Sequence, residues 1–205
     1  MDNTFCTKRP WMQTARHCVP LLAGGLLWLL AVMAGMRTLA IHEFTPGLAA
    51  RPSSQWPQTS ALRRAEDRPT LVLFLHPRCP CSCATLDELA KIVAHCRSRL
   101  AVYALFVRPS GMPEGWERAG SWEEAHAIPG VQVLTDPQGV EARRFTAWTS
   151  GQAMLYAADG RLLFSGGITA SRGHSGDNNG SAAVVQGVEQ GMVTLRRTPV
   201  FGCAL

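Results

Sequence analysis

FLHPRCPCSCATLDELAKI, residues 74–92, is the stretch of sequence that decides the fold. Residues 71–75 (LVLFL), which overlap the beginning of this stretch, form a short, wholly apolar run of the kind found in a central parallel strand. Pro77 and Pro80 interrupt that run, and apolar residues then recur at the spacing of one helix face: Leu86, Leu89, Ile92, Val93 and Cys96. The stretch therefore predicts a strand, a short turn and an amphipathic helix, with three cysteines where the helix begins: Cys79, Cys81 and Cys83.

A cysteine at the start of a helix is chemically special. The unpaired backbone N–H groups and the helix dipole stabilise an anion there, so a thiol loses its proton more easily. Arg78 adds a positive charge next to Cys79. Because the thiolate is the form that attacks disulfides, this position favours redox chemistry over the alternative, in which the cysteines only pack or staple the fold.

Composition sets the broad class of protein. The 205 residues are 46% hydrophobic and only 17% charged, which fits one modest domain plus an additional apolar segment. The net charge of +5 is mild, and no basic block stands out in the sequence after residue 43. We therefore expect a solvated, weakly basic surface and no nucleic-acid partner.

The additional apolar segment lies near the N-terminus. Residues 19–36 contain no charge and would span about 27 Å as a helix, close to the thickness of a bilayer's hydrocarbon core. Arg37 can snorkel, which extends the expected transmembrane helix over residues 19–41. Basic residues precede it, so residues 1–18 should be cytoplasmic and the rest exported: Lys8, Arg9 and Arg16. A cleavable signal peptide is the rival interpretation, with TLA at 38–40 as a weak cleavage site.

The remainder divides into a tether and a domain. Residues 42–69 are rich in proline and lack periodicity, which predicts a tether. In the domain, residues 70–205, further strands are expected at 101–107 and 131–134, and a hairpin at 152–157 and 161–166 around Asp159-Gly160. Short helices are expected near 121–127, 140–147 and 181–192. The order predicts an α/β sheet of mixed strand directions whose first two strands are parallel.

This order, with cysteines after the first strand, resembles the thioredoxin-like fold of membrane-tethered bacterial thiol–disulfide proteins. More narrowly, HPRCPCS, LLFSGGITASRGHSGDNNG and TPVFGC together look like the RedB-type thioredoxin-like proteins. The resemblance implies a thioredoxin-like mixed sheet flanked by helices, held at the bacterial inner membrane with its domain in the periplasm. Two features depart from ordinary thioredoxins: Ser82 stands where the second cysteine of C-x-x-C would be, and TAWTSGQAML lacks the usual cis-proline.

The resemblance also bears on which cysteines pair. The RedB-like pattern contains C-P-C, which favours a Cys79–Cys81 bridge, while Cys79–Cys83 remains the alternative. Cys203 in the C-terminal TPVFGC either pins the tail, with Cys96 as one candidate partner, or resolves Cys79 as a further redox thiol.

Two histidines are candidate supporting groups. In a thioredoxin-like sheet the second hairpin strand ends at the same edge as the cysteines, so the loop 166–180 should fold over the C-P-C turn with His174 as a proton acceptor or metal ligand. His76 is nearer in sequence and is the second candidate. Each has a plainer interpretation: a surface histidine in a loop for His174, and packing at the strand end for His76.

Two functions follow from these residues. The first is a membrane-anchored thiol–disulfide oxidoreductase without a cofactor, acting on protein thiols or disulfides, in which Cys79 attacks and Cys81 resolves. The second is a copper-handling protein, because Cys79, Cys83 and His174 resemble the C-x-x-x-C plus distant histidine of Sco-type copper chaperones. A membrane-tethered binding module without turnover is the third alternative.

Overall fold

The computed structural model describes residues 11–118 and 120–205, with side chains from residue 19 onward. The chain divides into two compact units, one up to His42 and the other from Glu43 to Leu205. Residues 1–10, which make up most of the expected cytoplasmic segment, lie outside the described residues.

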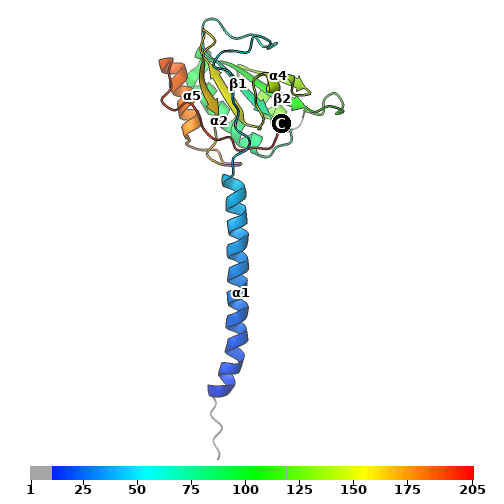
Figure 1. Cartoon of the computed structure of the whole chain (residues 1–205), viewed down its shortest axis with the longest axis vertical. Helices are drawn as coiled ribbons and strands as arrows, with labels where there is room; N and C mark the ends of the chain where they lie inside the picture. Colours follow the sequence, from blue (N-terminus) through cyan, green and yellow to red (C-terminus); the bar gives the residue numbers. More distant parts are fainter. Residues whose placement is uncertain (1–10, 119) are drawn as a thin grey trace, which may run out of the picture. The chain divides into compact units, whose positions relative to one another are not determined.

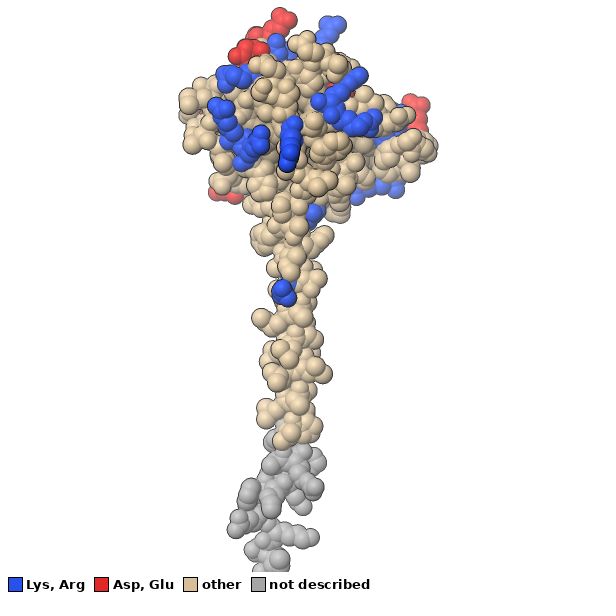
Figure 2. All heavy atoms as spheres, viewed as in Figure 1, with Lys and Arg blue, Asp and Glu red and all other residues tan. Residues whose placement is uncertain are grey.

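The first unit consists of a long helix. Helix α1 (Trp11–Phe44) contains an apolar stretch of 26 residues, Val19–Phe44, which is long enough to cross a membrane. Its described surface is almost free of charge (Figure 2), since Arg37 and Glu43 are the charged residues in that stretch. An N-terminal apolar helix is thus present where the sequence predicts one, and its length and composition fit a membrane anchor or a signal sequence.

The second unit is built on a five-stranded mixed sheet with the order β3-β2-β1-β4-β5. Strand β1 pairs in parallel with β2, and β2 with β3, while β4 runs antiparallel to both β1 and β5. The strands are β1 (Thr70–Leu75), β2 (Ala101–Arg108), β3 (Val131–Pro137), β4 (Gln152–Tyr156) and β5 (Leu162–Gly166). This arrangement confirms the predicted fold class, including the parallel first pair and the late hairpin.

Helices cover both faces of the sheet (Figure 1). The helices are α2 (Cys81–Cys96), the short 3-10 helix η1 (Arg97–Arg99), α3 (Gly120–His126), α4 (Val140–Arg144) and α5 (Asn179–Gln190). Because side chains alternate along a strand, β1 serves two cores. Its odd-numbered leucines pack with residues of α2, α3 and α5, while Val72 and Phe74 pack with residues of and next to α4.

Residues 45–69 differ from the predicted tether, because they pack on the domain. The Trp56 ring lies edge-on to the rings of Phe145 and Tyr156, with centroids 5.1 Å from each. The backbone of the same segment pairs with β5 and its turn: the Trp56 N–H donates to the Gly160 carbonyl at 2.8 Å. Proline removes periodicity, but it does not prevent an extended segment from burying isolated apolar side chains, so the domain begins well before β1.

Candidate active site at the start of helix α2

The turn between β1 and α2 places Cys79. The Cys79 N–H donates to the His76 carbonyl at 3.1 Å, and the Ser82 N–H donates to the Cys79 carbonyl at 2.9 Å. Pro80 takes the N-cap position of α2 with φ −59° and ψ −28°. Proline suits this place because its fixed φ is already helical and helix starts leave N–H groups unpaired. Cys79 therefore lies immediately before the helix N-terminus, where the sequence predicts it.

Three thiols meet at this turn. The thiols and backbone N–H groups of Cys81 and Cys203 lie near the Cys79 sulfur, and their hydrogen bonding lowers the pKa of the Cys79 thiol. All three are free cysteines, but they differ in exposure: Cys79 is only 3% exposed, Cys81 is half-buried and Cys203 is exposed. The sequence predicts a reachable Cys79, whereas the structure buries it.

Cys79 has the lowest pKa of the three thiols. Burial by itself would raise the pKa of Cys79, but the hydrogen bonds from Cys203 and Cys81 outweigh it and lower that pKa below its ordinary value. Burial and the neighbouring Cys79 thiolate raise the pKa of Cys81, and they raise the pKa of Cys203 to about 11. Cys79 is thus the first of the three to ionise, and its two neighbours remain thiols that donate to it.

Arg172 stabilises the second sulfur. It hydrogen-bonds the Cys81 thiol and partly offsets the rise in the pKa of Cys81, while its Nη1 donates to the Gly202 carbonyl at 2.6 Å. Arg172 belongs to the loop after β5, which the topology predicts over the C-P-C turn. The loop lies where the topology predicts it, but the sequence predicts a role there for His174 and none for Arg172.

The C-terminal tail brings Cys203 to the turn. The Ser150 N–H donates to the Cys203 carbonyl at 2.8 Å, and the Leu205 N–H donates to the Trp148 carbonyl at 3.0 Å, so residues 203–205 pair antiparallel with residues 148–150. The Ser150 hydroxyl in turn accepts from the His76 N–H at 2.9 Å, which ties this loop to the end of β1. Cys203 therefore lies beside Cys79, whereas Cys96 is fully buried in the core with α2, α3 and α5.

The other predicted sulfur and imidazole ligands lie apart from this cluster. Cys83 is exposed on α2, where burial and a hydrogen bond with Glu124 raise the pKa of its thiol. The His174 Nδ1 lies 3.2 Å from a carboxylate oxygen of Glu43. Among the residues that the structure describes, no group of three His, Cys, Asp or Glu side chains is arranged to hold a metal ion. The copper site of Cys79, Cys83 and His174 stays a prediction.

His76 and Arg78 both lie against Trp116. The imidazole packs edge-on to the Trp116 ring with centroids 5.7 Å apart, and the Arg78 guanidinium lies 4.8 Å from the centre of the ring. Burial, and then the charge of Arg78, lower the pKa of His76, which keeps its ring neutral at pH 7. The His76 and Arg78 side chains therefore pack on the same aromatic ring next to the turn.

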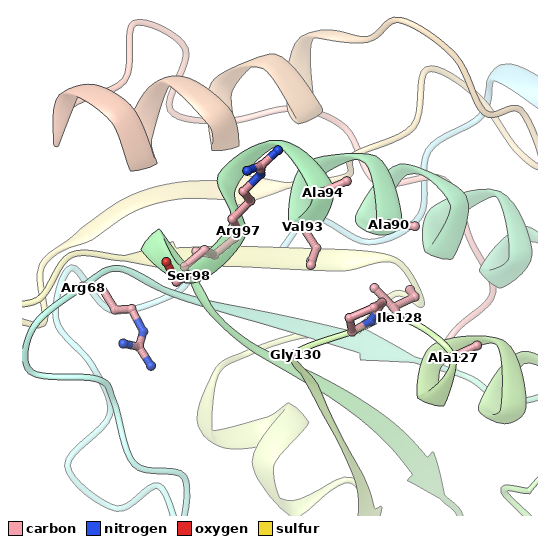
Figure 3. Close-up of a pocket in the computed structure, with 11 residues that line it drawn as sticks. Arg68, Ala90, Val93, Ala94, Arg97, Ser98, Ala127, Ile128 and Gly130 are labelled. Carbon is pink, nitrogen blue, oxygen red and sulfur yellow. The ribbon is translucent and has the colours of Figure 1, made fainter.

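A separate cavity of the domain lies away from this cluster. A cavity of about 770 Å³ opens at the C-terminal end of α2, where Val93 points toward Ile128 (Figure 3). Its lining also includes Ala94, Arg97 and Arg68. No cysteine lines it. A smaller hollow of about 340 Å³ lies beside the tail and is lined by His76, Trp148 and Leu205, among others. The chemistry-bearing groups are thus at the opposite end of α2 from this 770 Å³ cavity.

Comparison with known proteins supports the fold. No protein-family model and no curated protein matches the chain. Among solved structures, a hypothetical protein from Sinorhizobium meliloti is 24% identical with a TM-score of 0.57, covering 78% of this chain and 93% of that one. An uncharacterized conserved protein from Geobacillus kaustophilus is 18% identical with a TM-score of 0.55, covering 78% and 91%. The exposed lipoprotein thioredoxin Etrx1 from Streptococcus pneumoniae is 14% identical with a TM-score of 0.45, covering 61% and 86%. At these identities the likeness to the Sinorhizobium and Geobacillus proteins concerns the fold alone.

Proposed function

We propose that this protein is a thiol–disulfide oxidoreductase whose nucleophile is Cys79. The observation that carries the proposal is the meeting of three free thiols at the start of α2, with Cys79 receiving hydrogen bonds from both others. A structural cysteine would be bridged or surrounded by apolar groups, and its thiol would not collect donors. Donors that converge on one sulfur stabilise its thiolate, which is the reactive form in disulfide exchange.

The exchange proceeds through two substitutions at sulfur. The Cys79 thiolate attacks one sulfur of a substrate disulfide, forms a mixed disulfide and releases the other substrate sulfur as a thiolate. Cys81, once deprotonated, attacks the Cys79 sulfur, which releases the second substrate thiolate and leaves a Cys79–Cys81 disulfide. Two electrons pass from the protein to the substrate, and the reverse sequence would oxidise a substrate dithiol. Arg172 supports the second step, because its hydrogen bond favours the ionised form of Cys81.

The finer family and cellular setting form part of the same proposal. The C-P-C turn and the TPVFGC tail, which support the RedB-type resemblance, supply the three clustered sulfurs. The apolar helix would anchor the chain in a bacterial inner membrane, and the basic residues before it favour a cytoplasmic N-terminus and a periplasmic domain. Protein thiols or disulfides of the periplasm would then be the partners.

The test compares three serine variants of the full-length chain in detergent micelles. We expect Cys79→Ser to abolish reduction of the insulin disulfides. The double variant Cys81→Ser/Cys203→Ser retains no thiol beside Cys79, so it should accumulate mixed disulfides with substrate on a non-reducing gel. Cys83→Ser is the matched control, because the Cys83 thiol belongs to the same stretch of the chain but lies outside the cluster of three thiols. Full reductase activity in Cys79→Ser would exclude the proposed function.

A further inference from the structure

The burial of Cys79 poses a problem of access. Its residue is only 3% exposed, yet the sulfur has to reach a partner. Part of the cover is the C-terminal tail, since both the thiol and the backbone N–H of Cys203 contact the Cys79 sulfur. Cys203 itself is exposed. The buried nucleophile thus has a surface thiol directly beside it.

The tail, residues 198–205, is held in place on both sides of Cys203. Upstream, the Thr198 hydroxyl donates to the Gly167 carbonyl at 2.7 Å, and the Val200 carbonyl accepts from the Gly47 N–H at 2.8 Å. Downstream, the Leu205 N–H donates to the Trp148 carbonyl at 3.0 Å. These contacts fix an extended segment across the end of the sheet, so the approach of Cys203 to Cys79 is a built feature of the domain.

The tail also fits its place closely at Gly202. A Cβ at that residue would lie 2.0 Å from the Ser150 carbonyl oxygen, a distance that real side chains do not reach. The Gly202 carbonyl meanwhile accepts from Arg172, the residue that hydrogen-bonds Cys81. Gly202 therefore allows the backbone next to Cys203 to lie against the active-site loop, and Arg172 connects the tail to the C-P-C turn.

We propose that Cys203 is the third redox thiol of this centre: it forms a disulfide with Cys79 and presents that disulfide to external thiols at the surface of the domain. The inference rests on the proposed function and extends it, because it assigns the exchange with the next partner to the tail. The partner that fits is a dithiol, either a small molecule or a protein, that reaches the exposed sulfur of Cys203 without entering the turn.

The relay balances without any added oxidant. Starting from the Cys79–Cys81 disulfide, the Cys203 thiolate attacks the Cys79 sulfur, and Cys81 leaves as a thiolate stabilised by Arg172. The disulfide has then moved to Cys79–Cys203 with no change in oxidation state. One thiolate of the external dithiol attacks the exposed Cys203 sulfur and releases Cys79 as a thiolate. The second thiolate of the dithiol then frees Cys203, and the partner leaves as a disulfide.

Disulfide mapping tests the relay directly. The full-length chain in detergent is oxidised with glutathione disulfide, the remaining thiols are alkylated, and the non-reduced peptides are identified by mass spectrometry. We expect Cys81→Ser to form a Cys79–Cys203 bridge, and the unsubstituted chain to contain both Cys79–Cys81 and Cys79–Cys203 bridges. If Cys79 and Cys203 in Cys81→Ser carry only glutathione or alkyl groups, the relay is overturned.

A rate measurement separates this inference from the function on which it rests. Dithiothreitol should reduce the oxidised Cys203→Ser variant at least tenfold more slowly than the oxidised Cys83→Ser control. Equal rates in the two variants would overturn the role of Cys203 and leave the oxidoreductase assignment intact. Full insulin reductase activity in Cys79→Ser would instead remove the function itself.

Discussion

Substituting Gly202 by alanine should uncover Cys79. The added Cβ would overlap the Ser150 carbonyl oxygen, so the tail has to shift away from the loop. That shift breaks up to three hydrogen bonds: Ser150 to Cys203 at 2.8 Å, Leu205 to Trp148 at 3.0 Å, and Arg172 to Gly202 at 2.6 Å. At about 1 kcal/mol each, the loss weakens tail docking by about 2–3 kcal/mol, which corresponds to roughly a 30- to 150-fold larger open population.

The assay is the pH dependence of iodoacetamide alkylation of Cys79 in the reduced full-length chain, located by tandem mass spectrometry. Two quantities are measured. The plateau rate at high pH, where the thiol is fully ionised, should rise at least about tenfold because access improves. The midpoint reports the pKa of Cys79, on which the tail acts in two opposing ways: burial raises that pKa, and the hydrogen bonds from Cys203 lower it.

Gly120→Ala is the matched control, since a Cβ at Gly120 meets nothing within 4 Å. It should leave both the plateau and the midpoint where they are in the unsubstituted chain. A Gly202→Ala plateau within about twofold of this control would refute the reasoning, because the tail could then not be what limits access to Cys79.

Three further outcomes follow from the described contacts. Reductase activity should fall on acidification as the Cys79 thiolate is protonated, with a midpoint below the ordinary thiol value of 9.0. A midpoint at or above that value would contradict the arrangement of donors. Glu88→Gln should cost about 2 kcal/mol of unfolding free energy in urea at pH 7, because the buried carboxylate accepts from Lys91 and Gly176. Burial opposes ionisation of Glu88, but these hydrogen bonds lower the pKa of its carboxyl group. The stability that the carboxylate contributes is therefore present above about pH 4.3 and is lost as pH falls through the folded pKa. A cost of Glu88→Gln that does not change with pH would contradict this assignment. Trp56→Ala should lower the unfolding free energy by about 2–4 kcal/mol, although the sequence suggests a tether there, and an unchanged urea midpoint would mean that this segment is not part of the fold.

The elements of the fold follow from local patterns in the sequence. The apolar run at 71–75, the helical spacing after Cys83 and the Asp159-Gly160 turn each depend on residues a few positions apart, and each element lies where its pattern predicts. Right-handed crossover and hairpin geometry then leave few ways to order the strands. The segment at 45–69 is different, because its packing on the domain depends on single side chains such as Trp56 that contact residues far along the chain. No periodic pattern in the sequence predicts such contacts.

The chain of residues by itself determined that a cysteine precedes a helix start, because strand, proline turn and helix are neighbours in sequence and the thiol's environment at that point is local. Only the tertiary structure decided which groups surround that sulfur. Arg172 and Cys203 come from a loop and a tail far along the chain, and they reach Cys79 through backbone pairing and a close approach at Gly202. Hydrogen bonds and access act over a few ångströms in space, so the ionisation and the cover of this thiol are properties of the folded domain.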